Sequence, residues 1–271
     1  MLLENSGKRK IKSIKVYKDH VTLAFFKGEK LQISKEAFVS SYLYEGKSLA
    51  KKEIDQLLEI TAMSTLLNYA LGIVSKKHLS EKEMFEKLLK KESNYSVAKN
   101  VINKLKENDL LDDKAFMSDL IAWDNERNFG KNKIIKHLKD KGIPDSLIAK
   151  ASFPSSLERR KAKALIDKLE KKYVKYAYEN KKKHVYQALI AQGFTPDVAR
   201  EASEEVKRSS NKNELEILRK DYQKIKSRYQ RKYEGYQLKQ KIYAALVSKG
   251  YKHTEIKTVL EDLKYEDDCG F

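Results

Sequence analysis

The sequence predicts a mainly α-helical protein in which tandem three-helix repeats form an elongated, curved solenoid, with a small N-terminal antiparallel β element. Three observations predict this fold. A pattern of apolar residues and glycine recurs along most of the chain, at a spacing typical of stacked helical units. Only 3 prolines and 10 glycines among 271 residues leave little chain for loops. Near the N-terminus, apolar and polar residues alternate as they do in strands.

The recurring pattern reads apolar-apolar-x-x-apolar, then glycine four residues on, then an apolar residue six further on. The glycine is Gly142, Gly193 or Gly250 in three clear copies, and Glu92 takes its place in a degenerate first copy. These four positions are separated by 50, 51 and 57 residues. We expect each glycine to end a helix, because glycine adopts the left-handed backbone conformation without steric cost.

Residues 1–60 are predicted to form the β element and its covering helices. Apolar residues alternate with polar ones over residues 11–33, interrupted by two turn-like charged stretches. This pattern predicts a three-stranded antiparallel sheet. Because such a sheet is too small to be stable alone, we expect a helix that begins after Ser34 to cover one face. A second helix is predicted over residues 49–60.

Four helical repeats are predicted to follow, over residues 61–110, 111–153, 154–210 and 211–271. Each is expected to contain three helices. In the first repeat, one helix covers residues 62–77 and the next begins at Ser80, which forms a capping box with Glu83. The third and fourth repeats open with longer helices, over residues 157–178 and 214–233.

The junction between the first two repeats contains Leu110, Leu111, Asp112, Asp113 and Phe116. Asp112 suits a helix N-cap, and Asp113 suits the first helical turn, where the helix dipole favours negative charge. Leu111 and Phe116 flank the cap as a hydrophobic staple. Adjacent carboxylates could also indicate catalysis, but capping accounts for both aspartates, and we adopt that interpretation.

The chain carries a formal net charge of +18, which is concentrated in its third quarter. Residues 151–235 hold 22 Lys and Arg against 12 Asp and Glu. Such a field attracts nucleic acid or an acidic protein surface. Solvated helix faces rich in lysine would produce the same bias, so the charge alone does not choose between these readings.

Cysteine use and hydropathy indicate an intracellular protein. The single cysteine, Cys269, excludes a disulfide within one chain, and we expect a free thiol there. No run of about 18 apolar residues predicts a membrane span, and the first residues lack the apolar core of a signal peptide. We therefore expect a cytoplasmic protein that does not bind membranes, and we expect a monomer.

Motifs for catalysis and cofactor binding are absent from the sequence. It contains no His-Glu-x-x-His zinc motif and no Gly-x-x-x-x-Gly-Lys-Ser/Thr phosphate loop. It also lacks the dinucleotide motif Gly-x-Gly-x-x-Gly and the nucleophile motif Gly-x-Ser-x-Gly. We expect no catalytic residue, no metal and no cofactor, and therefore a protein that is not an enzyme.

Clusters of basic residues recur around equivalent helix starts in the last three repeats. Positive charge at a helix start opposes the helix dipole, so local stability does not explain these clusters. Stacked repeats would align them along one edge, and we predict that this basic ridge binds a protein partner or DNA. The predicted basic ridge comprises Arg127, Lys131, Lys133, Lys136, Lys139, Arg159, Arg160, Lys161, Lys181, Lys182, Lys183, Lys239 and Lys241.

The second repeat resembles the RecX family of regulatory proteins. The residues that carry the resemblance are Leu110-Leu111-Asp112-Asp113, Phe116, Arg127, Gly130, Lys133-Ile134, Leu138 and Lys141-Gly142-Ile143. The match covers roughly residues 62–151, and weaker repeats extend it to about residue 266. The leading β segment and the extra repeat look like the longer members from Gram-positive bacteria. The first repeat departs from the family pattern, since Glu92 stands where glycine is usual.

The resemblance implies a negative modulator of the RecA recombinase. Family members bind the RecA–ssDNA filament within its groove and restrain ATP hydrolysis, strand exchange and the co-protease activity that triggers the SOS response. On that expectation the partner is the RecA nucleoprotein filament, in homologous recombination and DNA repair. Whether the chain also contacts single-stranded DNA directly stays open.

Two other classes of function stay open from the residues alone. One is a sequence-nonspecific nucleic-acid-binding helical repeat protein without a recombinase partner, whose affinity for bare DNA would depend steeply on salt. The other is a scaffold for an acidic protein unrelated to recombination. The ratio of affinities for bare single-stranded DNA and for the filament separates the first from a recombinase modulator. A pull-down dominated by a protein other than RecA would favour the second.

Overall fold

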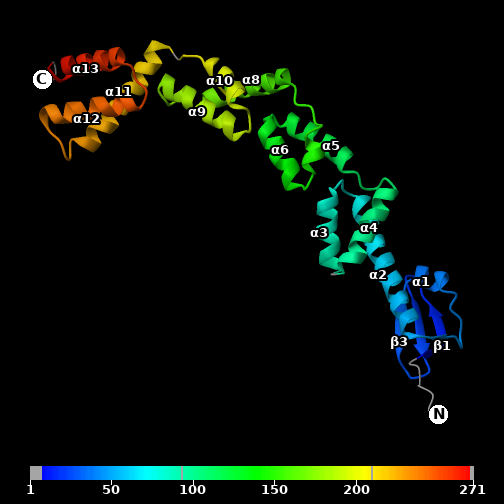
Figure 1. Ribbon diagram of the computed structural model, residues 1–271. Coiled ribbons are helices and arrows are strands. Elements are labelled where there is room, and N and C mark those ends of the chain that lie inside the picture. Colours follow the sequence, from blue (N-terminus) through cyan, green and yellow to red (C-terminus); the bar gives the residue numbers. More distant parts are fainter. Residues whose placement is uncertain (1–7, 93, 209, 269–271) are drawn as a thin grey trace. The chain divides into compact units, whose positions relative to one another are not determined.

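The computed structural model describes residues 8–92, 94–208 and 210–268 (Figure 1). The chain is mainly α-helical, with a small antiparallel sheet near its N-terminus, as predicted. It divides into two compact units. The first runs up to Asp119 and includes Leu138–Ala149; the second contains Leu120–His137 and the residues from Lys150 onward. Cys269 lies outside the described residues, and the elongated, curved shape stays a prediction.

The sheet has four strands in the order β3-β2-β1-β4, one more than predicted. The strands are β1 (Arg9–Val16), β2 (Val21–Phe25), β3 (Lys30–Ile33) and β4 (Ser48–Leu49). β4 escaped prediction because two residues are too short to show alternation, and Leu49 was assigned to the following helix. Leu49 is instead buried and pairs with Arg9.

One face of the sheet is covered by helices, as expected. Val21, Leu23 and Phe25 of β2 point into a core that also receives Ala37 of α1 (Lys35–Ser40). The hydroxyl of Ser34 caps α1 by accepting a hydrogen bond from the Ala37 amide at 3.1 Å. The predicted helix after Ser34 is therefore confirmed.

Helix α2 (Lys51–Val74) leads from the sheet to the first helical repeat. The prediction of separate helices over residues 49–60 and 62–77 was wrong, because one continuous helix covers most of both ranges. The segment has no proline, and the Thr61 hydroxyl donates to the Leu57 carbonyl at 2.7 Å, so this polar residue stays inside the helix. The first half of α2 packs in the sheet core, and the second half packs in the next core.

By length and composition, α2 is also the one helix among the described residues that could cross a membrane. Its most apolar 18-residue window has a mean hydropathy of 1.5. Counting uninterrupted apolar residues missed this helix, because Glu59 and several hydroxyl residues interrupt the run. Leu57 and Leu66 are buried in the two cores that α2 joins, which accounts for part of its apolar character.

The first repeat is completed by α3 (Glu81–Lys91) and α4 (Tyr95–Glu107), which lie side by side in Figure 1. The Ser80 hydroxyl accepts from the Glu83 amide at 3.2 Å, and the Glu83 carboxylate reaches back to the Ser80 amide. This confirms the predicted capping box. Met84 and Leu88 of α3 and Val101 of α4 are fully buried between these helices and α2.

The second repeat consists of α5 (Asp113–Glu126), α6 (Lys131–Asp140) and the short α7 (Asp145–Ile148). The Asp112 carboxylate accepts from the Lys114 amide at 2.7 Å, which confirms its capping role. Leu111 and Phe116 are buried, as the predicted hydrophobic staple requires, whereas Leu110 is exposed. Both α5 and α6 begin in one compact unit and end in the other.

The third and fourth repeats belong to the second unit, and each has its own hydrophobic core. Their helices are α8 (Ser155–Lys172), α9 (Tyr178–Ala191), α10 (Pro196–Glu204), α11 (Asn211–Tyr229), α12 (Gly235–Ser248) and α13 (His253–Asp268). α10 packs on both α8 and α9, and α11 packs on α12 (Figure 1). Pro196 occupies the first position of α10, as predicted.

The recurring glycines end helices and also let consecutive repeats approach closely. Gly142, Gly193 and Gly250 all have positive φ, between 81° and 90°, as the sequence predicted. A Cβ on Gly193 would lie 2.3 Å from the Cβ of Lys133, at the start of α6. The corresponding distance from Gly142 to the Lys82 Cβ is 2.6 Å. In both contacts, the glycine that ends the second helix of one repeat packs against the start of the second helix of the preceding repeat. We call this contact a glycine seat.

Hydrogen bonds complete the glycine seats. The Gly130 amide donates to the Gln192 carbonyl and the Asn132 amide donates to the Gly193 carbonyl, both at 2.9 Å. At the Gly142 seat, the Ser80 hydroxyl donates to the Lys141 carbonyl at 2.6 Å. Unpaired groups at the start of one helix and the end of another therefore satisfy each other.

Two seats also receive a carboxylate from the next repeat. Asp113 of α5 accepts a hydrogen bond from the Glu81 amide of α3 at 2.8 Å, and Glu158 of α8 accepts from the Lys131 amide of α6 at 2.9 Å. Asp113 therefore caps the neighbouring repeat as well as serving the first turn of its own helix. Its partial burial raises its pKa above 3.8.

Position 92 shows why the first copy lacks glycine. Glu92 ends α3 with φ −138°, an extended conformation open to any residue. The segment before α3 is the sheet with α2, which offers no second helix to be seated. The departure of Glu92 from the glycine pattern therefore follows from the order of the repeats.

Candidate interaction surface

An exposed cluster of aromatic and basic residues lies in the second unit, where α5 ends and α6 begins. Trp123, the only tryptophan of the chain, is 54% exposed. The guanidinium carbon of Arg127 lies 4.4 Å from the ring centroid of Trp123 and 4.6 Å from that of Phe129. Contact with two rings orients the guanidinium group, which stacks well on aromatic faces.

Phe129 anchors this cluster to the protein. Its side chain is buried, and the Lys133 ammonium nitrogen lies 3.7 Å from its ring centroid. The His137 ring meets Phe129 edge-on, with 5.5 Å between centroids. Two cations, Arg127 and Lys133, therefore share one buried ring. We call Trp123, Arg127, Phe129 and Lys133 the stacking cluster.

A buried carboxylate lies behind the stacking cluster. Asp124 is fully buried, and its Oδ2 lies 2.8 Å from Nδ1 of His137. Its Oδ1 has no hydrogen-bond partner among the described residues. The Asp124 carboxylate is therefore directed at His137 inside the protein and is not itself accessible to a partner.

The remaining residues of the predicted basic ridge fall into three groups: residues without an acidic partner, residues paired with acids, and two buried lysines. In the first group, four residues are exposed and have no acidic partner within the described part of the chain: Lys136, Arg160, Lys183 and Lys239. Two others contact aromatic rings, Lys131 over Phe153 at 5.7 Å and Lys241 over Tyr233 at 5.6 Å. All six retain charge that a partner could meet.

A second group is exposed or half-buried but paired with acids of the same unit. Lys139 contacts Asp145 at 2.9 Å, Arg159 contacts Glu201 at 2.8 Å, and Lys182 contacts Glu204. The hydrogen bond that Lys182 donates to Glu204 raises the pKa of Lys182. Surface pairs of this kind contribute roughly 0–1 kcal/mol to stability, so a partner could displace them at small cost.

Lys161 does not belong to a surface ridge, contrary to prediction. It is 3% exposed, and its ammonium group lies 2.5 Å from the Glu158 carboxylate, 2.6 Å from the Phe129 carbonyl and 2.8 Å from the Asn125 side-chain oxygen. Three acceptors satisfy its three donors. Lys161 thus holds the third repeat to the end of α5, inside the second unit.

Lys181 is likewise buried rather than part of a ridge. Only 5% of its surface is exposed, and its ammonium group donates to the Lys207 carbonyl at 2.7 Å. The Glu170 carboxylate lies 4.0 Å away. Lys181 therefore closes the third repeat, by tying α9 to the segment that follows α10.

Sequence spacing could have identified these two buried lysines. Glu158 and Lys161 continue the apolar stripe of Ala162, Leu165 and Ile166 at helical spacing. Lys181 stands four residues before Val185 on the buried face of α9. Trp123 was missed for a different reason: no repeat places an aromatic residue at an equivalent position, so it required attention as the single tryptophan.

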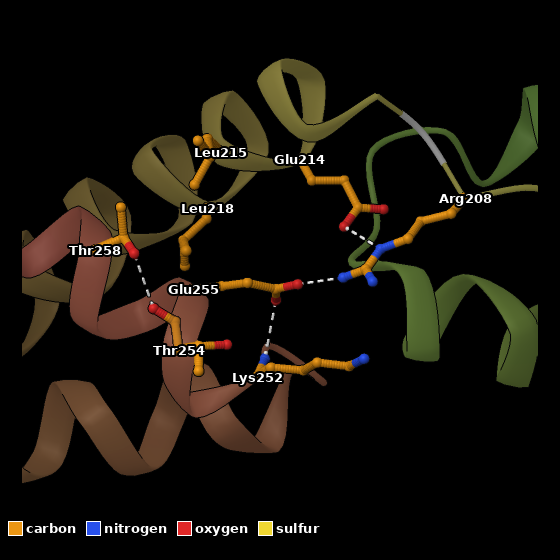
Figure 2. Close-up of a pocket in the computed structure, with 8 residues that line it drawn as sticks. All are labelled: Arg208, Glu214, Leu215, Leu218, Lys252, Thr254, Glu255 and Thr258. Atoms are coloured by element: carbon orange, nitrogen blue, oxygen red, sulfur yellow. Dashed lines mark hydrogen bonds and ion pairs between the residues drawn. The ribbon is translucent and has the colours of Figure 1, made fainter.

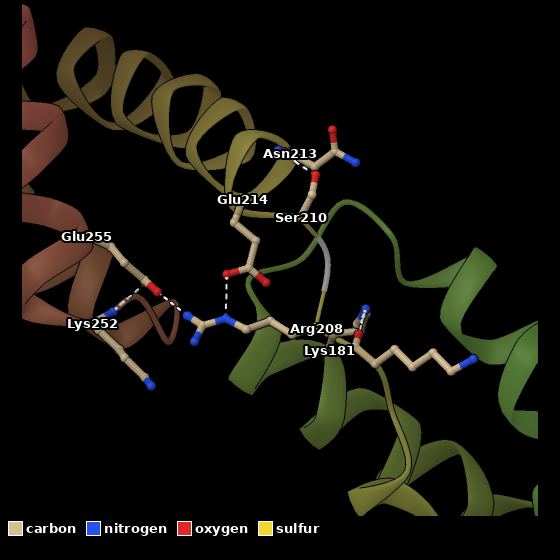
Figure 3. Close-up of polar contacts among 8 residues, drawn as sticks. Lys181, Arg208, Ser210, Asn213, Glu214, Lys252 and Glu255 are labelled. Carbon is tan, nitrogen blue, oxygen red and sulfur yellow. Dashed lines mark hydrogen bonds and ion pairs between the residues drawn. The ribbon is translucent and has the colours of Figure 1, made fainter.

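A second polar cluster, around Arg208, was not predicted. Figure 2 shows Glu214 of α11 and Glu255 of α13 both directed at the Arg208 guanidinium group. Arg208 precedes α11 and also lies 5.6 Å from the ring of Tyr178 in α9. Figure 3 shows the same residue between the two repeats, with Lys181 on its other side. Arg208 therefore links the third and fourth repeats.

The clefts among the described residues are open to solvent. One of about 390 Å³ is lined by the Arg208 cluster together with Leu215, Leu218 and Thr258 (Figure 2). Both carboxylates in it are already paired with Arg208. Among the described residues, no group of three or more His, Cys, Asp or Glu is placed to hold a metal ion.

Tandem three-helix repeats with a small antiparallel sheet define a helical-repeat protein. Residues 213–260 match the family model described as RecX, third three-helix domain. The chain is therefore similar to the RecX family of regulatory proteins.

Relatives of this family match nearly the whole chain. Regulatory protein RecX of Streptococcus equi subsp. equi is 26% identical over 259 residues, which cover 93% of this chain and 99% of the relative. Regulatory protein RecX of Streptococcus pyogenes serotype M3 is 29% identical over 241 residues, 86% of this chain and 92% of the relative. A crystal structure of regulatory protein RecX, 23% identical, covers 73% of this chain and 100% of its own with a TM-score of 0.62, and supports the fold.

Proposed function

We propose that this protein is a negative modulator of the RecA recombinase. It binds the RecA–ssDNA filament within its groove and restrains ATP hydrolysis, strand exchange and the co-protease activity that triggers the SOS response. The observation that carries this proposal is the match to streptococcal regulatory proteins RecX over 93% of the chain and 99% of the relative. Such coverage leaves only 7% of this chain outside the match.

The surface chemistry supports binding to a negatively charged polymer. The stacking cluster and the exposed Lys136 lie in one unit with Arg160, Lys183, Lys239 and Lys241. A filament offers DNA phosphates and protein carboxylates, both of which such cations attract. The glycine seats and the buried Lys161 fix neighbouring repeats to each other, and a partner ordered before binding loses less entropy on docking.

The test is the ATPase rate of RecA on single-stranded DNA, titrated with this protein. We expect the rate to fall at amounts well below one chain per RecA subunit, because one bound chain that spans several subunits affects all of them. An unchanged rate at equimolar protein would contradict the proposal.

The alternative is a sequence-nonspecific nucleic-acid-binding protein without a recombinase partner, which the stacking cluster would also serve. It predicts equal affinity for bare single-stranded DNA and for the filament at about 0.15 M salt. Tighter binding to the filament favours the RecA modulator. A scaffold for an unrelated acidic protein predicts weak binding to both.

A further inference from the structure

We propose that Trp123 and Arg127 form a stacking platform for a base of single-stranded nucleic acid. The nucleobase stacks on the indole ring of Trp123, and the phosphates of the same strand lie near the neighbouring cations. The inference rests on the proposed function in one respect: that function identifies the bound strand as the single-stranded DNA inside the RecA filament. The platform itself can be tested without RecA.

The geometry favours an exposed ring with a fixed orientation. Arg127 contacts Trp123 at 4.4 Å and also the buried Phe129 at 4.6 Å, so the guanidinium group connects the indole to the protein interior. Trp123 nevertheless stays 54% exposed. A large aromatic surface left in water and held in place loses little freedom when a planar ligand stacks on it.

The charge around the ring favours nucleic acid over a protein partner. Residues 120–137 carry four Lys or Arg against two acids. One of these acids, Asp124, is fully buried against His137, which leaves Glu126 as the exposed carboxylate of the segment. Arg127 and Lys133 lie on aromatic faces rather than in ion pairs, so their charge stays available to phosphate.

Stacking on an aromatic ring also suits a partner of any sequence. Every base has a π-face, so this mode of binding requires no pattern of hydrogen-bond donors and acceptors. A protein that acts along a filament must tolerate any DNA sequence. The platform supplies such contact at one position without reading the bases.

The experiment uses the intrinsic fluorescence of Trp123, which reports on this site alone because the chain has no other tryptophan. We expect an oligonucleotide of deoxythymidine to quench the emission as it binds. Affinity is then measured by the anisotropy of a labelled oligonucleotide. Trp123→Ala should weaken it roughly 5- to 100-fold, and Trp123→Phe, which keeps a ring, should have a smaller effect.

The matched control is Tyr69→Ala. Tyr69 is exposed in the first unit and has its own cation, Lys91, 5.9 Å from the ring, so it is a comparable aromatic–cation pair outside the stacking cluster. We expect its removal to leave affinity for the oligonucleotide unchanged. Circular dichroism of each variant checks that the helices are intact.

The possible results separate this inference from the proposed function. Absence of quenching, or equal affinity of Trp123→Ala and wild type, would overturn the platform even if RecA ATPase is restrained. Quenching and weakened binding by Trp123→Ala, together with an unchanged ATPase rate, would uphold the platform and overturn the RecA role. Equal weakening by Trp123→Ala and Tyr69→Ala would also overturn the platform, because it would indicate nonspecific effects.

Discussion

Single residues in this chain show that the position of a charge decides its role. Lys161 and Lys163 are two residues apart on α8, yet Lys161 is buried with three acceptors while Lys163 lies at the surface beside Glu205. Breaking a buried pair leaves an uncompensated charge in a medium that solvates it poorly. Breaking an exposed pair leaves the remaining charge solvated by water. The two lysines therefore offer a comparison within one helix.

We expect Lys161→Met to lower the free energy of unfolding of the second unit by about 3–5 kcal/mol, because Glu158 keeps its charge and loses its counter-ion. Lys163→Met should cost about 1 kcal/mol or less. Urea unfolding followed by circular dichroism measures both. Equal shifts in the two midpoints would mean that the Lys161 pair contributes no more than a surface pair.

Asp113 gives a prediction that depends on pH. Burial raises its pKa in the folded state above the ordinary value of 3.8, so the folded protein holds this proton to higher pH than the unfolded chain does. Between those two pKa values the folded state binds more protons, and its stability falls as the pH rises through the window.

Asp113→Asn keeps an oxygen that can accept from the Glu81 amide but removes the titration. Relative to this variant, the wild type should lose stability as the pH rises from the unfolded pKa near 3.8 through the raised pKa of the folded state, with the change complete above the raised pKa. The measurement is the urea midpoint of both proteins across that range. A constant difference would show that Asp113 titrates as it does in the unfolded chain.

At the scale of elements, the glycine seats make neighbouring repeats depend on each other. Gly193 adopts the left-handed conformation that ends α9, and it also packs directly against the backbone of Lys133. Gly250 has the same turn, but an added Cβ would lie 3.2 Å from the Asn180 amide nitrogen, a contact that small shifts can relieve. The two glycines thus share backbone strain and differ in crowding.

We expect Gly193→Ala to destabilise the second unit more than Gly250→Ala does. Both substitutions carry about 1–2 kcal/mol for an L-residue at positive φ, and Gly193 adds a clash that α6 must move to relieve. Urea unfolding of the two variants measures the difference. Should both lose the same stability, close approach would be unimportant and the turn alone would explain the glycines.

The sequence was sufficient where a local pattern determines local structure. Ser80 with Glu83 predicted a cap, and Gly142, Gly193 and Gly250 predicted helix ends, because both signals depend on a few neighbouring residues. Contacts between distant segments were not accessible in this way. The seat of Lys133 on Gly193 and the acceptors of Lys161 become visible only when the repeats are packed.

Two further errors have similar causes. The prediction divided α2 at residue 61, whereas the Thr61 hydroxyl donates to the Leu57 carbonyl and its oxygen also accepts from the Ser34 amide. The predicted basic ridge counted charge without burial, so it included Lys161 and Lys181. The predicted domain and repeat limits and the role of the exposed cations stay predictions.

For the whole molecule, the question is which of its many cations act on a partner. Exposed residues without an acidic partner are the candidates, and Lys136, Arg160 and Lys183 have this property among the described residues of the second unit. A set of equal charge in the first unit consists of Lys87, Lys99 and Lys104, which are also exposed. General electrostatic attraction would make the two sets equivalent.

We expect Lys136→Gln, Arg160→Gln and Lys183→Gln together to weaken restraint of the RecA ATPase and to reduce the salt dependence of binding to the filament, by about one unit of slope for each phosphate that is no longer neutralised. Lys87→Gln, Lys99→Gln and Lys104→Gln together should have a much smaller effect. The ATPase titration at two salt concentrations measures both. Identical behaviour of the two triple variants would mean that net charge, not a particular surface, is responsible.

The residue at position 92 bears on how proteins of this design can lengthen. A further repeat after α13 could form a glycine seat with the start of α12, if its second helix ended in glycine. Gly235 at that start has open space around it, and Tyr236 is exposed. An added repeat before α3 would meet a glutamate and an extended backbone in place of a seat. We therefore expect a repeat added after α13 to be accommodated more readily than one added before α3, which would first require a glycine at position 92.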